Sequence, residues 1–115
     1  MNLKQILKYR NDYSSEKLWK KLKEYAKVLG REVVYHILVL YYVMIDSKTP
    51  LKYKAIITGA LGYLILPTDL IPDAIPGLGF SDDVAAIMAA YKAVKSSISP
   101  EIENRARIKL QTWFK

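Results

Sequence analysis

Apolar residues recur at helical spacing along most of the chain, and no segment shows a serious strand or hairpin pattern. Between residues 15 and 29 the apolar positions fall within a narrow arc opposite the lysines, which predicts a basic amphipathic helix. Ser14 or Ser15 is suited to start this helix and Gly30 to end it. The apolar arc contains Leu18, Leu22, Tyr25 and Leu29, and the opposite side carries Lys17, Lys20, Lys23 and Lys27.

The next segment, 31–46, is apolar almost all round, which predicts a central helix that neighbours contact from several sides. Thr49 followed by Pro50 predicts a further helix over 50–66, with proline at its first position. Small residues on neighbouring turns of this helix, among them Gly59, permit close packing.

Two more helices are expected in the second half of the chain. An apolar face padded with alanines predicts a helix over 82–98, and Ser99 followed by Pro100 starts a last one. The pattern therefore predicts a single all-α domain over residues 1–115. It is a compact bundle of about five or six helices with a short basic N-terminal arm over 1–14.

Prolines, glycines and carboxylates concentrate between the helices 50–66 and 82–98, in a segment without Lys or Arg. Proline ends the arriving helix, glycine permits tight turns, and aspartate suits helix N-caps and first turns. The sequence predicts an acidic elbow here, with Asp69 as the N-cap of a short helix. The residues of this motif are Pro67, Asp69, Leu70, Ile71, Pro72, Asp73, Pro76, Gly77, Gly79, Asp82 and Asp83.

This elbow closely resembles the signature of the YkvA-like domain family, a family of small proteins without an agreed activity. The characteristic region of the family also includes the preceding helix, with Tyr63, and the start of the following one, so 50–98 is expected to be the YkvA-like core region. The resemblance implies a helical domain that acts at or near membranes. It supplies no catalytic residues.

The charge of the chain is unevenly distributed, with a net value of +7. Residues 1–32 carry nine basic and four acidic groups, whereas 55–91 carry four acidic groups and no basic ones. A basic surface of this kind attracts anionic lipid, nucleic acid or an acidic protein, although a lysine-rich surface also serves solubility alone. The amphipathic helix 15–29 can lie at a membrane interface or pack its apolar stripe on the core, and both readings remain open.

The longest uncharged apolar runs are too short to cross a bilayer. They comprise thirteen residues over 33–45 and twelve over 55–66, below the roughly 18 to 20 that a spanning helix needs. The start of the chain lacks the apolar core of a signal peptide, and there is no cysteine, which fits a reducing compartment. We therefore expect a cytoplasmic protein that associates with membranes peripherally, and a shallow helical hairpin in the membrane stays open as an alternative.

Enzymatic templates fit this sequence poorly. A single histidine, His36, and the absence of cysteine leave no nucleophile, base and orienting group, and no phosphate-binding glycine loop is present. Carboxylates close in sequence can bind Mg²⁺ or Ca²⁺, but capping already accounts for those of the elbow. The metal-site candidates of this alternative are Asp69, Asp73, Asp82 and Asp83.

The sequence thus favours a non-enzymatic helical interaction module, without catalytic residues or a cofactor. Its expected partner is a protein or an anionic membrane surface, contacted through the lysines of helix 15–29, and nucleic acid is a less favoured partner. The alternative is a divalent-metal-binding protein or metal-dependent hydrolase that uses the aspartates of the elbow. The sequence predicts neither the specific partner nor the oligomeric state.

Overall fold

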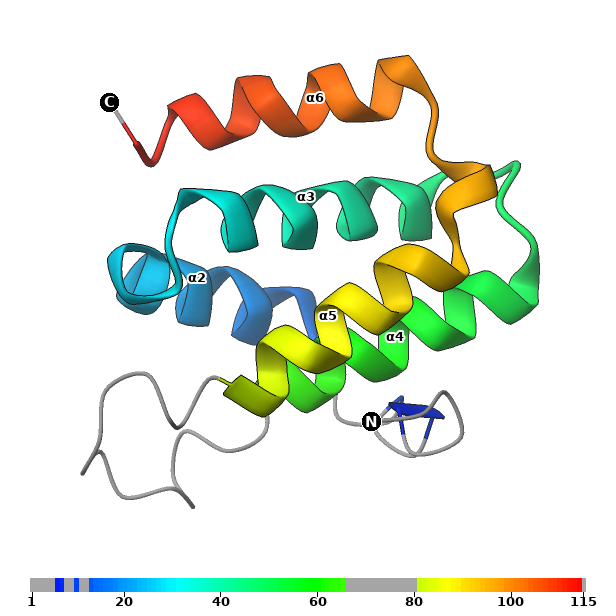
Figure 1. Ribbon diagram of the computed structural model, residues 1–115, viewed down its shortest axis with the longest axis horizontal. Coiled ribbons are helices and arrows are strands. Elements are labelled where there is room, and N and C mark those ends of the chain that lie inside the picture. The colour runs from blue at the N-terminus through cyan, green and yellow to red at the C-terminus, as the bar shows by residue number, and fades with distance from the viewer. Residues whose placement is uncertain (1–5, 8–9, 11–12, 66–80, 115) are drawn as a thin grey trace.

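The computed structural model describes residues 6–7, 10, 13–65 and 81–114, and it shows an all-α bundle (Figure 1). The described part contains five long helices, a short 3₁₀ helix and no strand. This confirms the predicted fold class. The elements are α2 (Ser15–Leu29), α3 (Arg31–Ile45), α4 (Leu51–Ile65), α5 (Ser81–Ala93), η3 (Lys95–Ser97) and α6 (Pro100–Gln111).

Helix α3 is the centre of the bundle, as its apolar character predicted. It packs against α2, α4, α5 and α6, so side chains on several of its faces are removed from water. In Figure 1, α4 and α5 lie side by side and antiparallel on one side of α3, and α6 lies on the other. The buried residues of α3 are Val34, Ile37, Leu38, Val39, Leu40 and Val43.

Local capping sets most of the helix boundaries. The Ser14 hydroxyl accepts a hydrogen bond from the Lys17 amide at 3.4 Å, and the Ser99 hydroxyl accepts one from the Ile102 amide at 3.2 Å. Gly30 separates α2 from α3 with φ of +91°, a conformation that favours glycine. Its amide donates to the Ala26 carbonyl at 2.9 Å, which closes the last turn of α2. These starts and the stop at Gly30 agree with the prediction.

Two boundaries differ from the prediction. Helix α4 begins at Leu51, one residue after the predicted start, and the buried Thr49 hydroxyl donates to the Val43 carbonyl at 2.7 Å near the end of α3. Helix α5 was expected to reach residue 98, but it ends at Ala93 and is followed by η3. Pro100 disfavours the helical conformation at Ser99, which is extended with φ of −100° and ψ of 162°, so a helix that continues through residue 98 is unfavourable.

In the segment before α2, the described residues Ile6, Leu7 and Tyr13 contact the core. Ile6 is fully buried, and its backbone carbonyl lies against Gly59 on α4. A side chain at position 59 would overlap this carbonyl, so the glycine is required by the close approach of two backbones. The predicted tight packing of α4 through small residues is therefore present at Gly59.

Candidate functional site on the basic surfaces

The lysines predicted to form the polar side of α2 are exposed. On the opposite side of α2, the side chains of the apolar stripe that the structure describes are buried in the core, whereas the side chain of Tyr25 lies outside the described residues. The described part of the stripe therefore follows the core-packing reading of the amphipathic helix. The exposed lysines are Lys17, Lys20, Lys23 and Lys27, and the buried residues are Leu18, Leu22, Ala26 and Leu29.

One lysine of α2 differs from the others. Lys21 is 5% exposed, and its ammonium group donates to the backbone carbonyl of Leu64, in the last turn of α4. The last carbonyls of a helix lack intrahelical partners and carry partial negative charge, so a cation is favourable there. The burial of this lysine was not predicted. The available signal was its position three residues after Leu18, at the edge of the apolar stripe.

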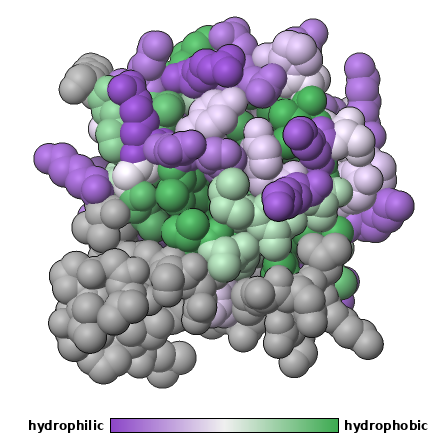
Figure 2. Space-filling model, viewed as in Figure 1, coloured by the Kyte–Doolittle hydropathy of each residue, from purple (hydrophilic) through white to green (hydrophobic). Residues whose placement is uncertain are grey.

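Basic side chains of α6 lie over aromatic rings of α2, α3 and the C-terminal segment, which again was not predicted. Their guanidinium or ammonium groups approach the ring faces as in cation–π pairs. The pairs are Arg105 with Tyr42 at 4.4 Å, Arg107 with Tyr35 at 5.7 Å, and Lys109 with Trp19 and Trp113 at 5.8 and 5.7 Å. Figure 2 shows the resulting concentration of hydrophilic side chains along the edge formed by α6.

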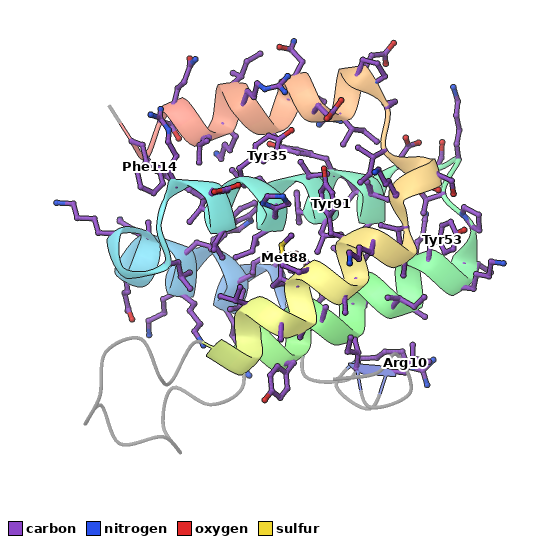
Figure 3. The ribbon with its side chains drawn as sticks, viewed as in Figure 1. Arg10, Tyr35, Tyr53, Met88, Tyr91 and Phe114 are labelled. Atoms are coloured by element: carbon purple, nitrogen blue, oxygen red, sulfur yellow. The ribbon has the colours of Figure 1, made fainter. Side chains whose placement is uncertain are left out.

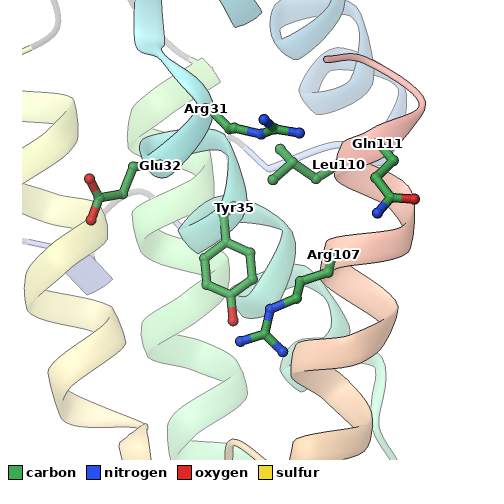
Figure 4. Close-up of a pocket in the computed structure, with 6 residues that line it drawn as sticks. All are labelled: Arg31, Glu32, Tyr35, Arg107, Leu110 and Gln111. Atoms are coloured by element: carbon green, nitrogen blue, oxygen red, sulfur yellow. The ribbon is translucent and has the colours of Figure 1, made fainter. Parts of the chain in front are cut away.

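An open groove of about 450 Å³ lies between α3 and α6 (Figure 4). Arg31 lies at its end near Phe114, whose carbonyl accepts a hydrogen bond from Arg31 Nη2 at 3.3 Å. Arg107 approaches the groove from α6 and extends towards Tyr35. The lining residues are Arg31, Glu32, Tyr35, Arg107, Leu110 and Gln111.

Tyr35 remains a neutral phenol at neutral pH. Burial raises the pKa of its hydroxyl above the usual 10.0, the Arg107 guanidinium opposes this rise, and the Glu103 carboxylate adds to it. The groove is therefore lined by the positive charges of Arg31 and Arg107, the carboxylate of Glu32 and a neutral hydroxyl.

His36 lies outside this groove and has a structural environment. Its Nδ1 donates to the Glu32 carbonyl at 2.7 Å, which leaves Nε2 as the acceptor of the neutral ring. The ring meets Tyr91 of α5 edge to face, with centroids 4.6 Å apart, and Tyr91 points towards α3 in Figure 3. His36 is therefore a hydrogen-bonded and partly buried side chain.

The elbow motif lies almost wholly outside the described residues. Asp69 and Asp73 belong to the segment 66–80, and the side chains of Asp82 and Asp83 at the start of α5 are likewise not described. Within the part that is described, no three His, Asp or Glu side chains come close enough together to hold a metal ion. The metal alternative and the capping roles of the elbow both stay predictions.

None of the described helices has the length and apolarity that a membrane span requires. The longest apolar helices, α3 and α4, have 15 residues each. This agrees with the expectation drawn from the two apolar runs of the sequence.

Comparisons with known proteins give two matches. Residues 53–89 match the family described as "Protein of unknown function (DUF1232)". The chain is also 29% identical over 75 residues to the uncharacterized membrane protein YkvA of Bacillus subtilis, in an alignment that covers 60% of this chain and 71% of the relative. No solved structure gives a significant match.

The matched region contains most of α4, the elbow and the first part of α5, which is the region that carried the predicted resemblance. Both matches confirm the predicted resemblance: residues 53–89 are similar to a family of unknown function, and the chain is similar to YkvA.

Proposed function

We propose that this chain is a non-enzymatic interaction module that contacts an anionic membrane surface through the lysines of α2. The observation that carries this proposal is the exposure of Lys20, Lys23 and Lys27, which share one side of a helix whose opposite side is buried in the core. The bundle presents these charges on a rigid element. The name of the relative YkvA, a membrane protein, supports the same setting.

The contact we propose is electrostatic. Because the apolar side chains of α2 that the structure describes pack in the core, the contact relies on the attraction of the helix's cations to lipid phosphates. A basic side chain near an anionic leaflet contributes about 1 kcal/mol. Exposed Glu16 and Glu24 lie on the same helix and reduce this attraction, so binding is expected to be weak and sensitive to salt.

The anionic leaflet of a plasma membrane is the cytoplasmic one, so the proposal includes the cytoplasmic location expected from the sequence. Contact from the membrane surface also requires no spanning helix. A protein partner with an acidic surface would be recognised by the same lysines, and the experiment below separates the two by using lipid alone.

Flotation with lipid vesicles at low salt tests this proposal. The wild-type chain is expected to bind vesicles that contain phosphatidylglycerol and not vesicles of phosphatidylcholine alone. A variant with Lys20→Gln, Lys23→Gln and Lys27→Gln should lose about 3 kcal/mol of binding free energy, or roughly a hundredfold in affinity.

A matched control changes Lys48, Lys52 and Lys95 to Gln, because these three lysines are also exposed and lie elsewhere on the bundle. The control should bind almost like the wild type. Equal losses in both variants would show that net charge, and not α2, governs binding. A wild-type chain that ignores anionic vesicles at low salt would exclude the proposal.

A further inference from the structure

Four aromatic side chains gather where α2, α3 and the end of α6 meet. Trp19 of α2 contacts Tyr41 of α3 edge to face, with ring centroids 4.6 Å apart, and its centroid lies 5.8 Å from that of Trp113. Tyr42 lies next to Tyr41, with centroids 5.4 Å apart. All four side chains pack against the core but are only partly buried. These residues form an aromatic cluster, part of which reaches the surface of the bundle.

Two cations of α6 border the aromatic cluster. The Lys109 ammonium lies 5.8 Å from the ring centroid of Trp19 and 5.7 Å from that of Trp113. The Arg105 guanidinium lies 4.4 Å from the ring centroid of Tyr42. The two basic residues are four positions apart, so they share one side of α6. A cation over a ring keeps N–H donors that can bond to other groups, so these two can also contact an anion.

The exposed lysines of α2 begin at the other border of the cluster. Lys23 is exposed and follows Trp19 by four residues, so the two side chains share one side of the helix. Basic residues outnumber acidic ones in both α2 and α6, which leaves this side of the bundle positively charged. Carboxylates near the cluster weaken this charge without cancelling it. They are the carboxylates of Glu16, Asp46 and Glu101.

This combination fits the head-group layer of an anionic bilayer. Tryptophan and tyrosine have an apolar body and a polar N–H or O–H group, so they collect at the boundary between hydrocarbon and water. Long basic side chains can lie along the apolar surface with their charge at the lipid phosphates. Ile45, four residues after Tyr41 on α3, is 47% exposed and extends the apolar surface. Because Arg105 and Lys109 lie over the rings, those faces are not open for stacking with nucleic-acid bases, which favours lipid.

We propose that the aromatic cluster enters the head-group layer of an anionic bilayer, with Arg105, Lys109 and the lysines of α2 at the lipid phosphates around it. The inference rests on the proposed membrane contact, to which it adds an apolar component. It also defines which side of the bundle faces the lipid, namely the side formed by α2 and α6.

Tryptophan fluorescence of the full chain tests this placement. The chain has two tryptophans, Trp19 and Trp113, and both belong to the cluster, so the emission reports on this surface alone. With vesicles that contain phosphatidylglycerol, the emission should shift to shorter wavelength. Lipid brominated near the head group should quench it more strongly than lipid brominated at the chain end. The variants Trp19→Phe and Trp113→Phe each leave one reporter, and each should still be quenched.

A matched pair of charge variants tests the same placement through affinity. Arg105 and Arg107 are both exposed on α6, and each lies over a tyrosine of α3, but Arg107 lines the α3–α6 groove and not the aromatic cluster. Arg105→Gln should weaken vesicle binding about fivefold, whereas Arg107→Gln should bind almost like the wild type. Unfolding curves verify that all variants are folded.

The outcomes separate this inference from the membrane contact itself. Vesicle binding without a change in tryptophan emission, or equal losses in the two arginine variants, would overturn the insertion of the cluster and leave the contact through the lysines of α2. Emission that changes with protein concentration in the absence of lipid would show that a second copy covers the cluster, and would overturn the assignment to lipid. A wild-type chain that does not bind anionic vesicles would overturn both proposals.

Discussion

The ammonium group of Lys21 donates a hydrogen bond to the backbone carbonyl of Leu64, and so joins α2 to the C-terminal turn of α4 in the interior of the bundle. The carbonyls of a last helical turn have no intrahelical partner, and burial without one is costly. Lys21 satisfies such a carbonyl immediately before the chain enters the elbow. With the Lys21 side chain directed into the bundle, the neighbouring Lys20 and Lys23 are exposed to solvent.

Replacement of Lys21 tests this relationship. We expect Lys21→Met to lower the free energy of unfolding by about 1 to 3 kcal/mol, because the methionine fills the space of the lysine stem but leaves the Leu64 carbonyl without its donor. Urea unfolding followed by circular dichroism measures the change. Lys20→Met is the control, since Lys20 is exposed on the next position, and its effect should remain within about 0.5 kcal/mol. Similar values for the two variants would mean that the buried bond contributes no net stability.

The substitution Gly59→Ala tests the contact between α4 and the N-terminal segment. Whether it lowers or raises the stability of the fold depends on the presence of Ile6. Alanine is the better helix former by about 1 kcal/mol, but at position 59 its Cβ would overlap the Ile6 carbonyl. In the full chain we expect Gly59→Ala to destabilise the protein by about 1 to 3 kcal/mol, as overpacking does. Thermal and urea unfolding would measure this loss.

The matched experiment repeats the substitution in a chain shortened to begin at Tyr13. Without Ile6 the overlap is absent, so Gly59→Ala should become neutral or stabilise the shortened chain by up to about 1 kcal/mol. A loss of equal size in both backgrounds would place the cause elsewhere in the packing of α4.

Stability should fall at alkaline pH through two tyrosines. Burial raises the pKa of Tyr13, with Ser15 opposing and Tyr41 adding to the rise, and burial also raises that of Tyr35. Below pH 10.0 both phenols are neutral in the folded and the unfolded chain, so their contribution is fully present. Above it the unfolded chain loses protons first, and stability declines as the pH rises through the folded pKa values.

Unfolding curves measured between neutral pH and the alkaline range would check this expectation. Tyr13→Phe and Tyr35→Phe should each make the decline shallower, because each removes one group whose proton affinity differs between the two states. A decline that is identical in the wild type and both variants would assign the alkaline loss to other groups.

The sequence predicted the local features of the fold better than those that depend on helix packing. Some features depend only on residues that are close in sequence, and the structure agrees with the predictions for them. They are the helical periodicity, the caps at Ser14 and Ser99, and the apolar character of α3 on all sides. The burial of Lys21 was not predicted, because it depends on how α2 packs against α4. The groove likewise depends on the placement of Arg107 on α6 against Tyr35 on α3, which no short segment encodes.

The elbow supplies the last prediction, which separates a structural from a metal-binding role for its aspartates. The sequence predicts Asp69 as a helix N-cap, a position outside the described residues. Asp69→Ala should therefore lower the free energy of unfolding by about 0.5 to 2 kcal/mol. Asp46→Ala is the matched control for loss of a capping carboxylate, since Asp46 Oδ1 accepts from the Lys48 amide at 3.0 Å in the α3–α4 turn.

Melting curves with Mg²⁺, with Ca²⁺ and with a chelator should coincide for the wild type. A melting temperature that rises with either cation in the wild type and the Asp46→Ala variant, but not in Asp69→Ala, would instead show that the elbow binds metal, because a ligand that binds only the folded state stabilises it by mass action.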